Sequence, residues 1–335
     1  MNKQKEKLLK KINSEGKMLF LGKADIETIK FLSERNQLTA VFTKMNDKNL
    51  IENSVHNARV LFAESFKEIK DEFDEVIVFQ EDFMGKDTIE FLKTAGEKTK
   101  IKGKIYFIGK TSRGAKNYGK KMNELFGNSE VVSIKGGTRL ISSVKEKQII
   151  KQEKKLSSFE FSLRKNKYFF SSTTGVFSKN RVDKGTKLLL DNLKEIKEKK
   201  ILDFGCGIGV IGLVLAKENP EAKVLLIDSD SKAVNLSKKN IELNKVKNAK
   251  AIVSDGFENV KEKFDLIASN PPTHEKRDFL EKFVSEARKK LNKKGKLIIV
   301  LNKAVFLEKE LNQVFGNCEI VAEGKEHKVI EAVKK

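Results

Sequence analysis

The second half of the chain alternates short apolar runs with stretches at helical spacing, and this alternation restricts the possible folds more than any other feature. The helical stretches span residues 210–217, 232–244 and 278–291. Helices of this length between strands are the crossovers that parallel strands need, so the pattern predicts a parallel, doubly wound α/β sheet. The apolar runs expected to form its strands are 200–204, 224–227, 251–253, 264–268 and 296–301.

The first half has the same rhythm in a weaker form, and parts of it match the second half directly. Segment 103–108 leads to 124–128 as segment 295–300 leads to 313–317, at an offset of about 190 residues. Duplication of one α/β unit explains this match, although two amphipathic α/β segments can also coincide by chance. The strands expected in the first half are 17–21, 38–42, 58–61, 75–79 and 104–108.

The two halves differ where a ligand would bind. The first strand of the first half is followed by Gly22 without a glycine cluster, and its fourth strand by Gln80 rather than by Asn-Pro-Pro. We therefore expect two tandem domains, 1–144 and 156–335, of which the first is a degenerate copy. The charged, glycine-free segment 145–155 is the expected linker.

The chain is strongly basic, with 68 Lys and Arg against 47 Asp and Glu and a net charge of +21. Such a charge favours a polyanionic partner, because neutralising phosphates drives nucleic-acid affinity. Only eight of the basic residues are arginine, and Trp is absent. Drift in an AT-rich genome also produces a lysine-rich chain of this kind, so the charge indicates a nucleic-acid partner without deciding it.

Composition argues against several other classes of protein. The two cysteines, Cys206 and Cys318, lie far apart, which fits a reducing cytoplasm rather than a disulfide framework. Three histidines without a Cys/His cluster predict no metal site. No run approaches the roughly 18 apolar residues of a membrane span, and residues 1–13 lack the apolar core of a secretory signal. We expect a cytoplasmic protein; no sequence feature reports oligomeric state, and the expectation is a monomer.

A glycine-rich loop, Asp203-Phe204-Gly205-Cys206-Gly207-Ile208-Gly209, follows the first strand of the second half and opens a helix. Glycines allow the sharp turn and the close approach of a ligand to the backbone. The loop also matches the dinucleotide fingerprint G-x-G-x-x-G, which alone is a weak signal. A carboxylate at the strand end, Asp203, favours a positively charged ligand such as a sulfonium over a pyrophosphate.

Two further carboxylates follow the next two strands. Asp228 ends the second strand, where its oxygens can accept hydrogen bonds from both hydroxyls of a ribose. Asp255 follows the third strand and is expected at the edge of an adenine. Asp228 has an alternative role as the N-cap of the next helix, which Asp230 or Ser231 could fill instead.

The fourth strand ends in Asn270-Pro271-Pro272, beside the glycine loop in a doubly wound sheet. A nitrogen conjugated with a ring or carbonyl is a poor nucleophile. The Asn270 side-chain oxygen and the Pro271 carbonyl can each accept one of its N–H groups, which aims the lone pair and stabilises the developing positive charge. The prolines stiffen the loop that carries these acceptors. The alternative is a turn that merely ends a strand.

Together, the glycine loop and the Asn-Pro-Pro resemble the class I methyltransferases that modify amino nitrogens. Gly175-Val176-Phe177-Ser178, Asp183-x-Gly185 and Leu188-Leu189-Leu190, with Gly109–Gly114 in the first half, are similar to RsmC-type guanine-N2 methyltransferases of ribosomal RNA. The resemblance covers most of the chain.

The resemblance implies two Rossmann-like methyltransferase domains, of which only the second binds S-adenosylmethionine, while the first helps folding and grips RNA. It also implies the site residues. The catalytic set is Asn270, Pro271 and Pro272; the substrate-binding set is Thr273, His274 and Phe177; the cofactor-binding set is Asp203, Gly205, Cys206, Gly207, Gly209, Asp228, Ser229, Asp255, Gly256 and Asn270.

Thr273 departs from the family, which has an aromatic residue after the two prolines. An aromatic there would stack on the flipped base, a contact worth about 1–3 kcal/mol. Phe279 or Phe177 could stack instead, or the target or activity could differ. His274 is retained, and contact with the substrate and a structural hydrogen bond are equally compatible with it.

The predicted activity is transfer of a methyl group from S-adenosylmethionine to the N2 amino group of a guanine in ribosomal RNA, with 16S RNA or the small subunit as partner. Two alternatives stay open: glutamine methylation of a protein, and an RNA-binding assembly factor with little turnover. The segment 164–169 interleaves bases and aromatics and is the first candidate for an RNA contact, although an amphipathic strand looks the same.

Overall fold

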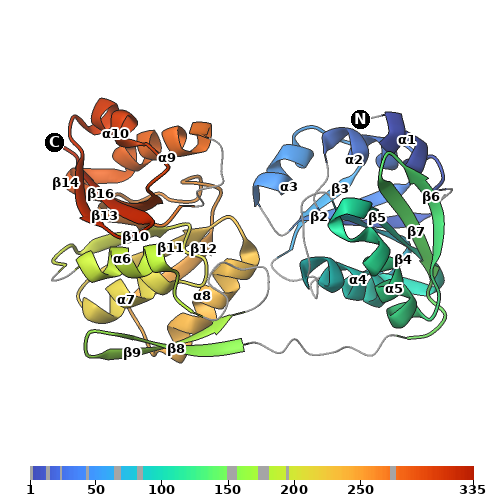
Figure 1. Cartoon of the computed structure of the whole chain (residues 1–335), viewed down its shortest axis with the longest axis horizontal. Helices are drawn as coiled ribbons and strands as arrows, with labels where there is room; N and C mark the ends of the chain where they lie inside the picture. The colour runs from blue at the N-terminus through green and yellow to red at the C-terminus, as the bar shows by residue number, and fades with distance from the viewer. Residues whose placement is uncertain are drawn as a thin grey trace. The chain divides into compact units, whose positions relative to one another are not determined.

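The computed structural model of the chain divides into two compact units, Met1–Lys154 and Lys155–Lys335. In Figure 1 the first unit runs from blue to green and the second from yellow-green to red. The structure describes residues 3–12, 16–22, 25–42, 45–63, 69–80, 86–148, 157–172, 181–193, 196–271 and 277–335.

Lys145 belongs to the first unit, although the linker was expected to begin there. Its side chain is 1% exposed, and its Nζ donates to the carbonyl oxygen of Thr99 at 2.6 Å. Its backbone N–H donates to the Gly103 carbonyl at 2.9 Å. A lysine that satisfies a strand-end carbonyl in this way is part of the fold, which the charge pattern of the segment did not reveal.

The first unit is a seven-stranded sheet in the order β3-β2-β1-β4-β5-β7-β6. The pairs from β3 to β5 are parallel, and β7 runs antiparallel to β5 and β6. The strands are β1 Lys17–Gly22, β2 Gln37–Phe42, β3 Arg59–Phe62, β4 Phe73–Gln80, β5 Thr99–Lys110, β6 Glu130–Lys135 and β7 Thr138–Val144. The helices are α1 Lys3–Leu9, α2 Ile26–Ser33, α3 Met45–Glu52, α4 Lys86–Lys98, the short 3₁₀ helix η2 Thr111–Arg113 and α5 Ala115–Phe126.

The second unit repeats this sheet in the order β12-β11-β10-β13-β14-β16-β15 and adds a separate hairpin, β8–β9. Again the first five strands of that order are parallel and β16 is antiparallel to its neighbours. The strands are β8 Ser157–Leu163, β9 Asn166–Ser172, β10 Lys200–Phe204, β11 Lys223–Asp228, β12 Ala249–Val253, β13 Phe264–Ser269, β14 Leu291–Asn302, β15 Glu319–Glu323 and β16 His327–Val333. The helices are α6 Lys184–Asn192, α7 Val210–Glu218, α8 Ser231–Leu243, α9 Arg277–Lys290 and α10 Glu308–Phe315.

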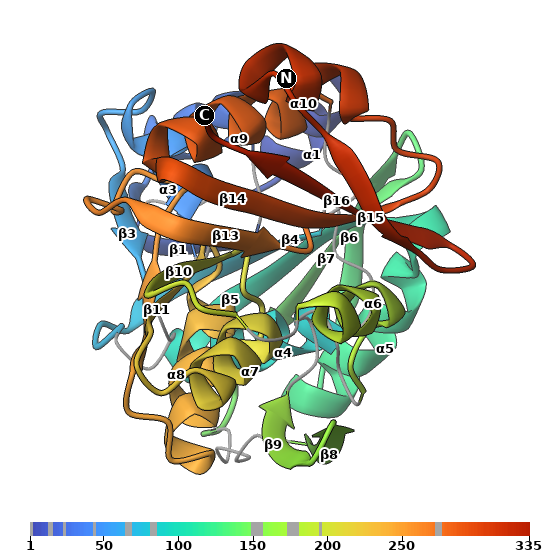
Figure 2. The same cartoon turned by 90° about the vertical axis from the view of Figure 1, so that its left-hand side faces the viewer.

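Each sheet is covered by helices on both faces, which confirms the expected pair of doubly wound domains. In the second unit one core holds apolar residues of α6, α7 and α8, and the core on the opposite face holds those of α9 and α10. Figure 2 shows α9 and α10 on one side of β13 and β14, and α6, α7 and α8 on the other. Burial on both faces explains why the central strands read as continuous apolar runs rather than alternating ones.

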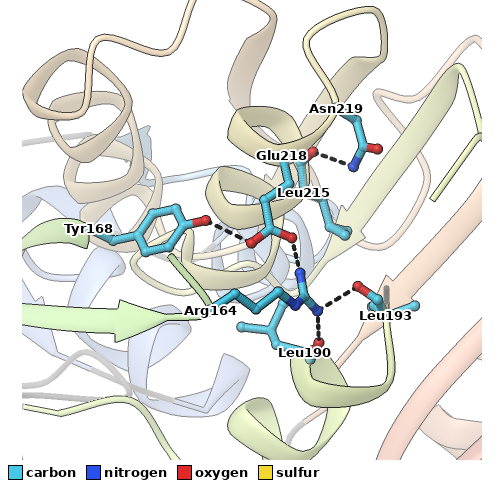
Figure 3. A network of polar contacts seen from close by, with 7 residues as sticks. All are labelled: Arg164, Tyr168, Leu190, Leu193, Leu215, Glu218 and Asn219. Atoms are coloured by element: carbon cyan, nitrogen blue, oxygen red, sulfur yellow. Dashed lines mark hydrogen bonds and ion pairs between the residues drawn. The ribbon is translucent and has the colours of Figure 1, made fainter. Parts of the chain in front are cut away.

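The hairpin β8–β9 contains the segment proposed for RNA contact, and two of its residues have structural roles. Arg164 forms an ion pair with Glu218 and donates to the carbonyls of Leu190 and Leu193 at 2.5 and 2.8 Å. Tyr168 is fully buried and donates its hydroxyl to Glu218 at 3.0 Å. Figure 3 shows this network joining the hairpin to the carboxyl ends of α6 and α7. The amphipathic-strand alternative therefore holds for these two residues.

Candidate functional site

The glycine loop and Asn270 leave the sheet side by side. Strand β10 lies between β11 and β13, and Phe204 is in register with Ser269 on the parallel strand β13. The Ser269 hydroxyl donates to the Phe204 carbonyl at 2.8 Å and ties the two strand ends together. The order of strands reverses at β10, which is where open α/β sheets bind their ligands. The candidate site is therefore at the carboxyl ends of β10 and β13.

The four glycines of the loop and helix α7 serve two purposes. Gly205 and Gly207 have φ of 68° and 57°, and a Cβ on either would meet no atom within 4 Å. Space is thus open above their backbone for a ligand. A Cβ on Gly212 would lie 2.5 Å from Leu226, and one on Gly209 would lie 2.8 Å from the Ser237 hydroxyl. These two glycines let α7 pack closely against its neighbours.

Asp203 lies beneath this loop with one oxygen unsatisfied. Its side chain is fully buried, and its Oδ2 accepts from the backbone N–H of Gly212 at 2.8 Å. Its Oδ1 is buried and has no hydrogen-bond partner among the described residues. Burial, and secondly the charge of Asp228, raises the pKa of Asp203 to about 7. A buried acceptor without a partner is costly, so this atom suits a cationic or N–H donor from a ligand.

Asp228 links the glycine loop to the start of α8. Its Oδ2 accepts from the Gly207 N–H at 2.9 Å and its Oδ1 from the Asp230 N–H at 2.9 Å. The N-cap of α8 is Asp230, whose carboxylate accepts from the Lys232 N–H at 2.9 Å. The capping alternative for Asp228 is therefore wrong. Ser229, half-buried, follows it.

The turn after β12 brings Asp255 toward Asp228. The N–H of Ser254 donates to the Asp228 carbonyl at 3.0 Å, and its hydroxyl donates to the Gly256 carbonyl at 2.8 Å. Gly256 has a φ of 52°, a backbone conformation in which a residue with a side chain would be strained. Asp255 is half-buried between these two residues. Asp228 at the end of β11 and Asp255 just after β12 therefore share the edge of the sheet with the glycine loop.

Cys206 contributes to the shape of the loop through its backbone. Its N–H donates to the Ile227 carbonyl at 2.9 Å, and its carbonyl accepts from the Gly209 N–H at 2.8 Å. Its thiol is buried, 3.5 Å from the Ser237 hydroxyl, and burial raises the pKa of this thiol well above its usual value. The side chain packs in the core, so any cofactor contact of Cys206 is confined to its backbone.

Asn270 extends from the end of β13 and is held by the start of α6. Its Nδ2 donates to the Asp183 Oδ2 at 3.1 Å and to the Thr186 hydroxyl at 2.9 Å. Asp183 is the N-cap of α6, and the same Oδ2 accepts from the N–H groups of Gly185 and Thr186 at 2.9 and 3.1 Å. The amide nitrogen of Asn270 is thus engaged by the protein, and its carbonyl oxygen is left for a ligand.

Several predicted residues lie outside the described ranges, namely Phe177, Pro272, Thr273 and His274. Pro271 is buried directly after Asn270. Phe279, the alternative stacking residue, is partly buried and packs against the core beneath α9 and α10.

Asp183 and Thr186 were not predicted as site residues. Asp183-x-Gly185 was noted as a motif, and the available signal was an acidic residue at a helix start, which reads equally well as a simple N-cap. Among the described residues, no group of three or more His, Cys, Asp or Glu side chains could hold a metal ion. No helix within the described ranges has the length and hydropathy of a membrane span.

Comparison with known proteins assigns the family. The model of the methyltransferase small domain matches residues 167–331. The ribosomal RNA small subunit methyltransferase C of Shewanella denitrificans is 32% identical over 270 residues, covering 78% of this chain and 77% of that protein. The chain belongs to the ribosomal RNA small subunit methyltransferase C family. This confirms the resemblance read from the glycine loop, the Asn-Pro-Pro and the upstream motifs.

Two further matches cover the whole chain and 58% of it, respectively. The RsmC of T. thermophilus, a 16S rRNA guanine-N2 methyltransferase solved with AdoMet and guanosine, superposes with a TM-score of 0.88 at 26% identity, covering 100% of this chain and 92% of that one. The ribosomal RNA large subunit methyltransferase G of Psychromonas ingrahamii is 31% identical over 205 residues, covering 58% of this chain and 51% of that protein. The latter match spans about half the relative's length.

Proposed function

We propose that the second unit transfers the methyl group of S-adenosylmethionine to the N2 amino group of a guanine in the 16S RNA of the small ribosomal subunit. The observation that carries this proposal is the Asn270 amide at the end of β13. Its nitrogen is held by Asp183 and Thr186, and its oxygen is the acceptor that an amino group needs. The site lies beside a glycine loop with open space above it.

The residues present fit S-adenosylmethionine, which supplies an electrophilic methyl group on a sulfonium. The unsatisfied Oδ1 of Asp203 would accept from the ammonium of its amino-acid part, and Asp228 would accept from the ribose hydroxyls. Asp255 would meet the adenine edge, with Ser229 and Gly256 flanking it. Gly205, Gly207 and Gly209 would let the ligand approach the loop backbone.

Asn270 and Pro271 would prepare the acceptor. The Asn270 Oδ1 accepts one N–H of the guanine amino group and the Pro271 carbonyl accepts the other. These two bonds aim the nitrogen lone pair out of its conjugation with the ring and stabilise the positive charge that develops on it. The methylated nitrogen then loses its proton to water, so no side chain has to act as a base. Pro272, Thr273, His274 and Phe177 would complete the substrate pocket.

RNA is the favoured acceptor for reasons outside the site. The chain carries a net charge of +21, and the relative from Shewanella denitrificans and the neighbour from T. thermophilus are both named for ribosomal RNA of the small subunit. The first unit would grip RNA with its basic surface, in the cytoplasm where subunits are assembled.

Methyl transfer from labelled S-adenosylmethionine tests the proposal. The acceptors are unmodified 30S subunits, naked 16S RNA, 50S subunits and a release factor, followed by nucleoside analysis for N2-methylguanosine. We expect label in the 30S subunit or its RNA, in N2-methylguanosine. Label only in 50S subunits would favour the activity named for the relative from Psychromonas ingrahamii. Label only in protein would support glutamine methylation, and label in none would leave an assembly factor.

A further inference from the structure

The side chains around Asn270 determine which end of its amide faces the acceptor nitrogen. An asparagine amide can present either its oxygen or its NH₂ group after a half-turn of the side chain, and only the oxygen accepts a hydrogen bond. An amide presenting NH₂ to an amino group would pair donor with donor. A neighbouring group must therefore hold the Asn270 amide with its oxygen toward the acceptor nitrogen.

The start of α6 provides this selection. A carboxylate has no donor, so the Asp183 Oδ2, 3.1 Å from the Asn270 amide nitrogen, is compatible with NH₂ and not with the carbonyl oxygen. Thr186 alone would not select, because a hydroxyl can donate or accept; here it accepts from the same nitrogen at 2.9 Å. The orientation of the Asn270 amide is thus set by Asp183.

Asp183 is itself held in place. Its Oδ2 accepts from the backbone N–H groups of Gly185 and Thr186 in the first turn of α6. A Cβ on Gly185 would lie 3.0 Å from the same oxygen and 3.0 Å from the His327 ring, so glycine leaves room for the carboxylate. The carboxyl end of α6 is also fixed, because Arg164 donates to the carbonyls of Leu190 and Leu193 (Figure 3).

We propose that Asp183 is a positioning residue for methyl transfer, which fixes the Asn270 amide with its carbonyl oxygen toward the acceptor nitrogen. This inference rests on the proposed function and adds a residue to it. A carboxylate bonded to the amide N–H also shifts electron density toward the amide oxygen and strengthens it as an acceptor, since linked hydrogen bonds polarise one another. Asp183 touches neither substrate nor cofactor in this account.

Three substitutions separate positioning from helix capping. Asp183→Asn keeps an oxygen that can cap α6 and accept from Asn270. Asp183→Ser keeps a good cap, but its side chain ends one bond earlier and loses the contact with Asn270. Asp183→Ala loses both. Capping alone predicts that the Asn and Ser variants behave alike, and positioning predicts that the Ser variant behaves like the Ala variant.

The measurements are kcat and KM on 30S subunits, the affinity for S-adenosylmethionine by calorimetry, and the melting temperature. We expect Asp183→Asn to keep kcat within about threefold, and Asp183→Ser to lower it by about tenfold to a hundredfold with unchanged cofactor affinity. The Asn and Ser variants should melt together. Asp191→Asn is the matched control, since Asp191 lies on the same helix, exposed and paired with Lys187, and it should leave kcat unchanged.

A double substitution tests whether Asp183 acts through Asn270. Adding Asp183→Ser to Asn270→Ala should lower kcat no further, because the amide that Asp183 orients is gone. An Asp183→Ser variant as active as Asp183→Asn, or a further loss of tenfold or more on the Asn270→Ala background, would overturn the proposal about Asp183 while the proposed function stands. A wild-type chain that transfers no methyl group to any RNA would overturn the proposed function and this inference with it.

Discussion

The two units have the same sheet, and they differ at its carboxyl edge. In the second unit, a Cβ on Gly205 or Gly207 would meet nothing within 4 Å, so the edge is open. In the first unit, a Cβ on Gly22, the last residue of the corresponding strand β1, would lie 2.3 Å from the Phe79 carbonyl. The backbone at Gly22 therefore lies against β4, whereas the backbone at Gly205 and Gly207 has room for a ligand. The fold alone therefore does not make the site.

The polar residues at the edge of the first unit hold its own structure. Asp25 caps α2 by accepting from the Thr28 N–H at 2.7 Å and forms an ion pair with Lys5. The Lys5 ammonium also lies 4.4 Å from the centre of the Phe79 ring. In the second unit the acidic residue beneath the loop, Asp203, instead keeps a buried oxygen without a partner among the described residues.

The parts that hold the sheet together recur in both units. Asn128 accepts from the N–H of Val144 and donates to its carbonyl, at 2.7 and 2.8 Å. Asn317 does the same with Val333, at 2.8 and 2.7 Å. This is the local repetition that a duplicated unit would keep. Interactions that stabilise the sheet are thus present twice, and the groups suited to chemistry are present once.

The largest expected effect comes from removing the acceptor of the second unit. Asn270→Ala should lower kcat by at least about a hundredfold to a thousandfold, because the acceptor for the amino N–H is lost. Affinity for S-adenosylmethionine should stay within about threefold, measured by calorimetry. Gln80→Ala, at the corresponding strand end of the first unit, is the control and should leave kcat of the folded protein unchanged. A near-normal kcat of the Asn270→Ala variant would show that Asn270 is not what makes the second unit active.

Asp203 should make the stability of the second unit depend on pH. Burial raises the pKa of Asp203 to about 7, above the value near 3.9 of an unfolded chain. The protonated form is therefore favoured in the folded state. The contribution of Asp203 to the free energy of unfolding is fully present below about pH 4 and is lost as the pH rises through about 7. Asp203→Asn is neutral at every pH. Its free energy of unfolding should therefore rise relative to that of wild type by about 1–4 kcal/mol as the pH increases from about 4 to about 7.

Urea unfolding at pH 4.5, 6 and 8 without cofactor measures this gain. The same substitution should weaken S-adenosylmethionine binding at pH 8, where wild type offers a carboxylate. Asp265→Asn is a control, because Asp265 lies near the start of β13, at the opposite edge of the sheet from Asp203, where it accepts from the Lys200 N–H at 3.0 Å. If the free energies of unfolding of Asp203→Asn and wild type change with pH in the same way, the pKa of Asp203 is not raised in the folded state.

Asp228 should affect the cofactor and not the chemical step. Asp228→Ala should weaken binding of S-adenosylmethionine by about 1–3 kcal/mol through lost charge-assisted hydrogen bonds. Part of this loss arises because the variant no longer accepts a hydrogen bond from the Gly207 N–H in the glycine loop. With saturating cofactor, kcat should recover to near the wild-type value. Asp230→Ala is the matched comparison: it removes the cap of α8 and should lower stability with a smaller change in affinity.

The smallest expected effects compare the shared parts of the two units. Asn128→Ala and Asn317→Ala should each lower the free energy of unfolding of their own unit by about 1–3 kcal/mol, since each breaks two hydrogen bonds to the backbone. Hydrogen exchange resolved by segment reports which unit is affected. Similar losses are expected, whereas a loss in only one unit would show that the repeated geometry is not equally important in both.

The sequence predicted the parallel strands well and missed the antiparallel ones. The expected strand 200–204 has the bounds of β10, and the neighbouring strands differ by a residue or two at most ends. β6 and β15 were not predicted: they are edge strands with mostly exposed residues, and their apolar runs are only two and three residues long. β5 and β14 begin five residues earlier than expected, and within these extensions Lys102 and Lys294 have positive φ values of 64° and 62°, which carry no sequence signal.

For the candidate site, the sequence predicted positions better than contacts. Strand ends place Asp203, Asp228 and Asn270 at one edge, since parallel strands share their direction. Which atoms are engaged depends on packing, so the unsatisfied oxygen of Asp203 and the buried thiol of Cys206 were not foreseen. Asp183 was missed because it lies far from Asn270 in sequence, and only the folded chain brings α6 to the end of β13.

The stoichiometry and location of cofactor binding test the central claim most directly, namely that one of two matching sheets carries the site. Titration calorimetry of the wild-type chain with S-adenosylmethionine should give one site per chain. Gly205→Val, which fills the open space at a φ of 68°, should abolish that site while the far-ultraviolet circular dichroism is kept. Two sites per chain, or full binding by the Gly205→Val variant, would contradict the account.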